Sequence, residues 1–213
     1  MKILLADDHK IMREGLRALI EKHGDMDVVE EAGDGRTAVQ LTRKLRPDVV
    51  VMDLTMPVLN GIDATRQIMA AVPGARVIAL SIHSDRRFVS QMFKAGAKGY
   101  LLKDCASEEL ILAIRTVADG KTYLSPGIAG AVVAEYVRSL AKHEETTQPS
   151  LTAREGEVLQ LLAEGKTTKQ AAAILDISVK TVETHRRQIM GKLQLNSVAE
   201  LTKYAIREGL TPL

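Results

Sequence analysis

Short apolar runs alternate with longer stretches of helical periodicity along the first 120 residues. Five runs predict β-strands, at residues 2–6, 27–31, 49–53, 76–81 and 99–103. Between and after them, apolar side chains recur every three or four positions, which predicts helices at about residues 9–23, 37–45, 62–72, 85–94 and 107–119. Strands and helices that alternate in this way predict an α/β fold with a doubly wound, five-stranded parallel sheet.

A different pattern begins at Leu151, beyond which every apolar repeat is helical. Thr152 and Glu155 have the spacing of a capping box at the start of a first helix. Further helices are expected at about residues 168–175, 179–193 and 197–208, with Thr168 as the cap of the second helix. Two short helices joined by a tight turn match helix-turn-helix geometry, so we expect a smaller all-α domain over residues 151–213.

Residues 121–150 are expected to connect these two parts. Tyr123–Leu124–Ser125–Pro126 introduces one more helix, which we expect to extend to about Ala141. Residues 142–150 contain no apolar residue and therefore predict a flexible linker. The expected division is a first domain at 1–120, a linker helix and linker at 121–150, and a second domain at 151–213.

The composition is that of an ordinary globular protein, with 46% hydrophobic and 26% charged residues. A single cysteine, Cys105, excludes an intramolecular disulfide and fits a reducing compartment. Asp7 and Asp8 end the N-terminal apolar stretch too early for a signal peptide. No apolar run approaches the roughly 20 residues that a membrane helix needs. We therefore expect a cytoplasmic protein without a membrane segment.

The excess of basic charge lies in the C-terminal region. Residues 1–148 carry 20 basic and 20 acidic residues, whereas residues 149–213 carry nine and seven. Between Val179 and Leu195, four basic residues accompany one acidic residue, Glu183. This local excess indicates a polyanionic partner, although an ordinary solvated helix face produces the same pattern.

The carboxyl ends of the predicted strands collect polar side chains. Right-handed crossovers place all these ends at one edge of the sheet, where open α/β sheets hold their sites. Asp53 ends the most apolar run, and the same edge receives Asp7, Asp8, Ser81 and Lys103. Each residue alone is more often a cap, turn or surface residue, but their convergence indicates a site.

The carboxylates at this edge repel one another, and a hard divalent cation such as Mg²⁺ would stabilise them. Asp53 could then attack a phosphoryl group as a nucleophile. Lys103 would pair with one phosphoryl oxygen and Ser81 would donate a hydrogen bond to another. Positioning and charge stabilisation are most of what phosphoryl transfer requires, so this set of residues suits that chemistry.

These residues resemble the receiver domain of two-component response regulators over about residues 1–120. The motifs are Asp7–Asp8, Asp53–Pro57 with Gly61, Ser81 and Gly99–Lys103. The resemblance implies a flavodoxin-like fold and phosphorylation of Asp53 by a sensor histidine kinase. It implies Mg²⁺ held by Asp8, Asp53 and the backbone carbonyl of Thr55, with Asp7 acting through water. It also implies that Ser81 and Tyr100 change rotamer when the phosphoryl group arrives.

The C-terminal region resembles the LuxR-type helix-turn-helix, and the two domains together resemble the NarL/FixJ subfamily. The motifs are Leu151–Leu159, Ala171–Leu175, Ile177–His185 and Lys192–Leu193. The resemblance implies that Val179–Leu193 is the recognition helix and that the last helix, Val198–Glu208, can dimerise. It implies base or groove contacts by Glu183, Thr184 and Arg187, and phosphate contacts by Lys180, Thr181, Lys192 and, more weakly, Lys169.

We interpret the chain as a phosphorylation-controlled transcriptional regulator that binds double-stranded DNA, uses Mg²⁺, is not an enzyme and forms a homodimer when phosphorylated. One alternative is an aspartate-nucleophile phosphatase. Such enzymes usually carry a second aspartate two residues after the nucleophile, where this chain has Thr55. A second alternative is a DNA-binding protein whose receiver is never phosphorylated. The full set of Asp7, Asp8, Asp53, Ser81 and Lys103 argues against it.

Overall fold

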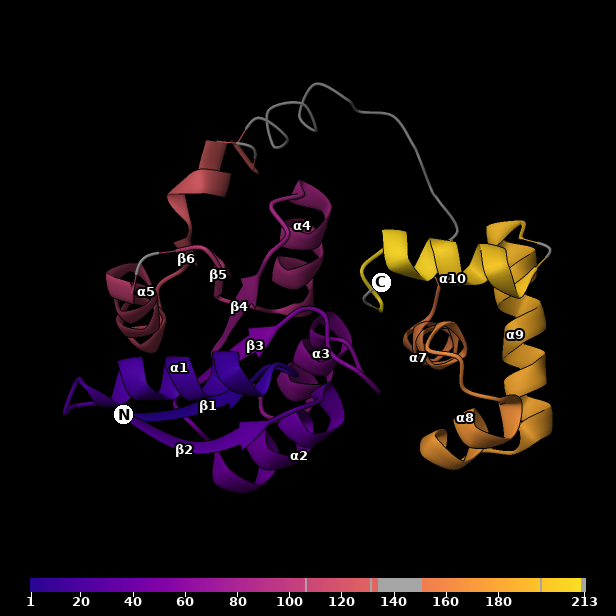
Figure 1. The fold of residues 1–213 in the computed structure, drawn as a ribbon, viewed down its shortest axis with the longest axis horizontal. Coiled ribbons are helices and arrows are strands. Elements are labelled where there is room, and N and C mark those ends of the chain that lie inside the picture. The colour runs from indigo at the N-terminus through magenta and orange to yellow at the C-terminus, as the bar shows by residue number, and fades with distance from the viewer. Residues whose placement is uncertain (106, 131, 134–150, 196, 212–213) are drawn as a thin grey trace.

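The computed structural model describes residues 1–105, 107–130, 132–133, 151–195 and 197–211. An N-terminal α/β domain and a C-terminal helical domain lie next to each other (Figure 1). Residues 126–130 and 132–133 are helical, in agreement with the helix expected after Pro126. The expected end of that helix at Ala141 and the linker at 142–150 lie outside the described residues. In the part of the chain that is described, no helix is long and apolar enough to cross a membrane.

The N-terminal domain contains one parallel sheet with the strand order β2-β1-β3-β4-β5-β6. The strands are β1 (Lys2–Ala6), β2 (Asp27–Ala32), β3 (Val49–Asp53), β4 (Val77–Ser81), β5 (Gly99–Leu102) and β6 (Tyr123–Leu124). All five strands expected from the sequence are present. The order places β3 at the centre, as the apolar run before Asp53 indicates.

The sixth strand, β6, differs from the expectation that Tyr123 leads directly into a helix. Tyr123 and Leu124 pair in parallel with Gly99 and Tyr100 of β5. The backbone N–H of Tyr123 donates to the carbonyl of Lys98 at 2.9 Å, and that of Ser125 to the carbonyl of Tyr100 at 2.9 Å. Two residues are too few to show an apolar pattern. This strand forms because the edge of β5 offers backbone groups with which residues 123 and 124 can pair.

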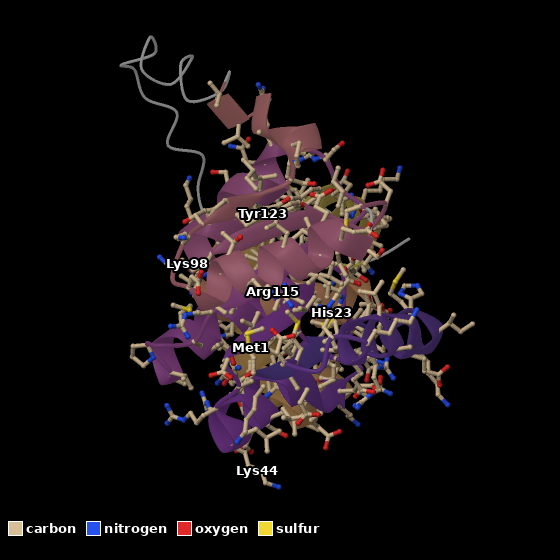
Figure 2. All side chains as sticks on the ribbon, turned by 90° about the vertical axis from the view of Figure 1, so that its left-hand side faces the viewer. Met1, His23, Lys44, Lys98, Arg115 and Tyr123 are labelled. Carbon is tan, nitrogen blue, oxygen red and sulfur yellow. The ribbon has the colours of Figure 1, made fainter. Side chains whose placement is uncertain are left out.

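Five of the helices in the described part of the chain cover the two faces of the sheet. They are α1 (Lys10–Glu21), α2 (Gly35–Leu45), α3 (Gly61–Ala71), α4 (Arg86–Ala95) and α5 (Ser107–Ala118). Leu4, Val50 and Met52 face the side of α2, α3 and α4, whereas the intervening Leu5 and Val51 face α1 and α5. Figure 2 shows the α5 side, where Arg115 lies near His23, which follows α1. The buried strands thus contribute side chains to both cores.

The C-terminal domain contains α7 (Ala153–Ala163), α8 (Thr168–Leu175), α9 (Val179–Leu193) and α10 (Val198–Arg207). The expected capping box of Thr152 and Glu155 is confirmed. The expected cap of α8 is wrong, because Thr167 rather than Thr168 is the N-cap. The side chain of Thr167 accepts from the backbone N–H of Gln170, and Oε1 of the Gln170 side chain accepts from the backbone N–H of Thr167. Either threonine suits an N-cap position, but only Thr167 has a glutamine three residues later, at position 170, to complete a capping box.

Gly61 allows the loop after β3 to return against the strand that it leaves. A Cβ atom at position 61 would lie 1.9 Å from the carbonyl oxygen of Asp53. We predict that Gly61→Ala lowers the free energy of unfolding by about 2 kcal/mol or more, because the backbone must shift. Thermal or urea unfolding measures this. Gly74→Ala is the matched control, since no atom lies within 4 Å of a Cβ there; an equal loss in both variants would contradict the prediction.

Candidate functional sites

The carboxyl edge of the sheet brings together the polar side chains that the sequence placed there. Ala6 of β1 pairs with Met52 of β3, so Asp7 and Asp53 emerge beside each other. Ser81 ends the neighbouring strand β4, and Lys103 follows β5. Asp7 and Asp53 are each 2% exposed and Ser81 is fully buried. The topology rule for parallel strands therefore predicts this cluster correctly.

Lys103 neutralises two carboxylates at once. Its Nζ atom lies 2.8 Å from Oδ2 of Asp53 and 2.7 Å from Oδ2 of Asp7. The lysine side chain is 10% exposed, so all three charges are shielded from bulk water. Two buried carboxylates would be strongly destabilising without this partner.

The electrostatics of the pair follow from burial and from mutual attraction. Burial raises the pKa of Asp53 to about 6, although Lys103 works in the opposite direction. Burial disfavours the charged ammonium of Lys103, but Asp53 and Asp7 outweigh it and raise the pKa of Lys103. At neutral pH the lysine is therefore positive and Asp53 is mainly a carboxylate, the form that a nucleophile requires.

Asp8 and His9 complete an acidic cluster that suits a metal ion. Potential ligand atoms of Asp7, Asp8, His9 and Asp53 all lie within 4.8 Å of one another. Three carboxylates form the oxygen-rich set that hard divalent cations prefer, so the donor chemistry fits such an ion. The structure thus supports a metal site built from Asp7, Asp8 and Asp53.

Sequence reasoning missed His9 as a neighbour of this cluster. Its Nδ1 atom lies 2.8 Å from Oδ1 of Asp8 and 3.2 Å from Oδ1 of Asp7. The side chain is 71% exposed and occupies the N-cap position of α1 without a capping hydrogen bond. Its adjacency to Asp8 was the available signal, but a lone histidine at a helix start gives no reason to choose it.

Ser81 and Tyr100 are joined through the loop that follows β4. The backbone N–H of His83 donates to Oγ of Ser81 at 3.0 Å, and the Tyr100 hydroxyl donates to the His83 carbonyl at 2.8 Å. Tyr100 is fully buried, and burial raises its pKa to about 12. His83 therefore links the two residues, a role that the sequence did not indicate.

Thr55 lies in the loop immediately after Asp53. Its backbone N–H is 3.5 Å from Oδ1 of Asp53, a long contact that places the loop backbone directly at the acidic cluster. The segment between Asp53 and α3 therefore lines this site, so contacts that hold the segment in place also affect the site.

In the C-terminal domain, α8 and α9 form a compact helical pair. Asp176 ends α8 in the left-handed conformation, with φ of 53°, and Ser178 caps α9. Val182 and Ile189 are fully buried, as the apolar stripe of α9 predicts. The opposite face of α9 is open to solvent, and Figure 1 shows α9 on the side of this domain away from the sheet domain.

The expected DNA-contact residues divide by their surroundings. Five of them are exposed: Lys169, Lys180, Glu183, Thr184 and Arg187. Thr181 is half-buried at the first turn of α9, where its Oγ1 atom lies 2.8 Å from Oγ of Ser178. The first turns of a helix are the part that reaches base edges in a major groove. The structure therefore brings most of this set to one accessible face.

Lys192 is held in a different way. Its Nζ atom lies 2.7 Å from Oε2 of Glu155, and the lysine side chain is 37% exposed. The same glutamate oxygen accepts from the backbone N–H of Thr152 at 2.7 Å. Lys192 thus ties α9 to the start of α7, and a phosphate contact would compete with this ion pair.

Comparison with known proteins agrees with this geometry. Residues 3–115 match the family model of the response regulator receiver domain, and residues 149–205 match that of the bacterial regulatory proteins of the LuxR family. The oxygen regulatory protein NreC of Staphylococcus carnosus is 39% identical, with 99% of both chains covered. The transcriptional regulatory protein MctR of Rhizobium johnstonii is also 39% identical, with 99% of this chain and 95% of MctR covered.

Solved structures show the same similarity. A LuxR-family response regulator from Aurantimonas matches 64% of this chain and 97% of its own, with 43% identity and a TM-score of 0.62. An RcsB–DNA complex matches 96% of both chains, with 26% identity and a TM-score of 0.59. The similarity to RcsB therefore extends over both domains.

The buried carboxylate of Glu155 supplies a test of the C-terminal domain. Burial disfavours its charge, but Lys192 and Thr152 outweigh burial and hold the pKa of Glu155 below its usual value. Its stabilising effect is therefore present above the pKa of an unfolded-chain glutamate and is lost as the pH falls through the folded-state pKa. We predict that Glu155→Gln lowers the free energy of unfolding by about 1–3 kcal/mol at neutral pH.

Chemical unfolding of the full chain at several pH values measures this effect. The difference between wild type and Glu155→Gln should shrink as the pH falls below about 4. Glu183→Gln, on the exposed face of α9, is the control and should change stability little. A difference that stays constant with pH would contradict the assigned ion pair.

Proposed function

The chain belongs to the two-component response regulators that join a receiver domain to a LuxR-type DNA-binding domain, and from this we propose that Asp53 accepts the phosphoryl group that controls DNA binding. The observation that carries the proposal is the position of Lys103 between Asp53 and Asp7, within an acidic cluster at the carboxyl edge. The family consists of transcription factors rather than enzymes, so the phosphatase alternative is set aside. We assign the receiver to residues 1–120, which contain the matched region 3–115, and the DNA-binding domain to residues 151–213, which contain the matched region 149–205 except for its first two residues.

In the proposed reaction, an Asp53 carboxylate oxygen attacks the phosphorus of a phosphohistidine on the sensor kinase. The new O–P bond forms an acyl phosphate, and the P–N bond breaks, which leaves the electron pair on the histidine nitrogen. Lys103, already next to Asp53, pairs with the added negative charge. A histidine kinase is the partner that a receiver domain implies.

Asp7, Asp8 and Asp53 are proposed to hold Mg²⁺, together with the backbone carbonyl of Thr55. The ion would neutralise charge on the transferring phosphoryl oxygens. Asp7 also forms an ion pair with Lys103, so its carboxylate would offset the positive charge of the lysine before and after transfer.

Ser81 and Tyr100 are proposed to report phosphorylation to the rest of the molecule. Ser81 would donate its hydroxyl hydrogen to a phosphoryl oxygen. Because both side chains bond to His83, a rotamer change at Ser81 also disturbs the bond between Tyr100 and the His83 carbonyl. The expected result is a shift between two arrangements of the β4–α4 loop.

The α9 helix is proposed to enter the major groove of double-stranded DNA. Glu183, Thr184 and Arg187 would contact base edges or the groove, and Lys169, Lys180, Thr181 and Lys192 would contact phosphates. The RcsB structures include two dimers bound to DNA. We propose that this chain likewise forms a homodimer when phosphorylated, so that two α9 helices reach half-sites about one DNA turn apart.

Phosphorylation control gives a direct binding test. We predict that Mg²⁺ with beryllium fluoride, a phosphoryl mimic, tightens binding to a target promoter fragment by about 5- to 150-fold, the usual range of allosteric coupling. Titration of the fragment at one fixed salt concentration measures the change. Asp53→Ala should show no tightening. Equal affinity with and without the mimic would favour the alternative of a phosphorylation-independent receiver.

The roles on α9 give a second test. We predict that Lys180→Ala weakens binding equally for all DNA sequences and lowers the salt-dependence slope by about 1. Arg187→Ala should instead reduce discrimination among sequences, at a cost of about 1–3 kcal/mol for the preferred site. Lys44→Ala, exposed on α2 of the receiver, is the control. Loss of discrimination in Lys180→Ala alone would contradict the assignment.

A further inference from the structure

Arg13, in the first turn of α1, connects the turn after β1 to the neighbouring strand β2. Its Nη1 atom donates to the backbone carbonyl of Asp7 at 2.6 Å, and its Nε atom donates to Oε2 of Glu31 at 3.1 Å. The side chain of Arg13 is 15% exposed and that of Glu31 is 23% exposed. A largely buried guanidinium with two acceptors in different directions is a fixed link between them rather than a solvated surface charge.

The carbonyl that Arg13 binds belongs to the peptide unit between Asp7 and Asp8. Because a peptide unit is planar, a bond that fixes the direction of the Asp7 carbonyl also fixes the direction of the Asp8 Cα atom. The backbone N–H of Asp7 donates in turn to the carbonyl of Ala32 in β2 at 3.1 Å. The main chain at the two aspartates is therefore held by β2 on one side and by Arg13 on the other.

Of these two aspartates, Asp8 has the less constrained side chain. Oδ1 of Asp7 accepts from the backbone N–H of His9 at 2.8 Å, and Oδ2 of Asp7 pairs with Lys103 at 2.7 Å. Oδ1 of Asp8 is buried and makes no hydrogen bond within the described residues, although Nδ1 of the exposed His9 approaches it to 2.8 Å. The place of the Asp8 carboxylate thus depends mainly on its backbone, which Arg13 orients.

Glu31 anchors Arg13 as a stable carboxylate. It also accepts from Nε of Arg17, one turn further along α1, at 2.6 Å. Arg17 above all, together with Arg13, holds the pKa of Glu31 below its usual value, although burial opposes this. Glu31 is therefore negative at neutral pH. Its charge offsets that of Arg13, so Arg13 can orient the peptide unit while its own positive charge is partly neutralised.

We propose that Arg13 is a positioning residue for the divalent cation. By holding the peptide unit between Asp7 and Asp8, it keeps the Asp8 carboxylate near Asp53 and so raises the affinity for the ion. Potential ligand atoms of these three aspartates already lie within 4.8 Å of one another. The inference rests on the proposed metal site of Asp7, Asp8 and Asp53, to which it adds a residue that is not itself a ligand.

The charge of Arg13 and its positioning effect act in opposite directions, which makes the test decisive. A nearby positive charge repels a cation, so removal of that charge alone would tighten binding. We expect Arg13→Ala instead to weaken binding about tenfold, the lower end of the range for groups that orient metal ligands. Titration of the full chain with Mn²⁺, which prefers the same oxygen ligands as Mg²⁺, measures this through the EPR signal of the free ion.

Arg17→Ala is the matched control. It removes the same charge from the same helix and also takes a partner from Glu31, but the bonds of Arg17 go to Glu31, Glu21 and the carbonyl of Val28. Its Mn²⁺ affinity should equal or slightly exceed that of the wild type. Far-UV circular dichroism without metal verifies that each variant is folded.

Arg13→Lys tests the same point with the charge retained. A lysine keeps the positive charge but lacks the planar fork that binds two acceptors at once, so we expect a loss of affinity between those of wild type and Arg13→Ala. This variant also keeps the inference testable if Arg13→Ala does not fold. An affinity equal to that of the wild type in Arg13→Lys, with tighter binding in Arg13→Ala, would show an effect of charge alone.

Phosphorylation of the full chain by acetyl phosphate supplies a second measurement, followed by intact-protein mass. Arg13→Ala should need about tenfold more Mg²⁺ for its half-maximal rate and should reach the wild-type rate at saturating Mg²⁺. A general disruption of the receiver would lower the saturated rate and leave the Mg²⁺ requirement unchanged, which would contradict the positioning role.

The outcomes separate this inference from the proposed function. If the wild type binds Mn²⁺ and Arg13→Ala binds it equally or more tightly, the inference is overturned while the metal site stands. Equal weakening in Arg13→Ala and Arg17→Ala also overturns it, because loss of either partner of Glu31 would then be enough. If the wild type binds Mn²⁺ no better than Asp8→Ala, the proposed metal site itself fails.

Discussion

The ion pair of Lys103 with Asp53 and Asp7 is the interaction on which the receiver site depends. A parallel sheet places the carboxyl ends of its strands together, and in this chain that rule concentrates carboxylates where water is largely excluded. One buried ammonium at 2.7–2.8 Å from two of them makes the arrangement stable. The same ammonium group of Lys103 can pair with the negative charge of an incoming phosphoryl oxygen. Stability and reactivity therefore come from the same contact.

The walls of this site belong only in part to the receiver. The loop after β3 carries a strained Val58 and is bonded to Gln160 and Glu164 of α7, and the loop after β4 rests on Phe88 and Gly209. These two loops are therefore places where the C-terminal domain lies close to the receiver site. These contacts are direct: α7 side chains bond to the loop after β3, and Gly209 packs closely on the Phe88 ring.

In the DNA-binding domain, Glu155 likewise takes part in two interactions at once. This carboxylate completes the capping box of α7 and pairs with Lys192 of α9, so it fixes the angle between the two helices. Lys192 is thereby less available to a phosphate than Lys180, which is exposed at the first turn of α9. The proposed phosphate contact of Lys192 would therefore compete with its ion pair to Glu155.

The sequence by itself determined the five core strands, the helices between them, the convergence of Asp7, Asp53, Ser81 and Lys103, and the basic exposed face of α9. These follow from local periodicity and from the general handedness of strand connections, which need no knowledge of this chain's packing. Tertiary structure alone decided the short strand β6, the nearness of His9 and the role of His83. It also decided the insertion of Gln160 into a loop 100 residues earlier in the chain. Such contacts leave no periodic pattern, because they depend on which surfaces meet after the local elements have formed.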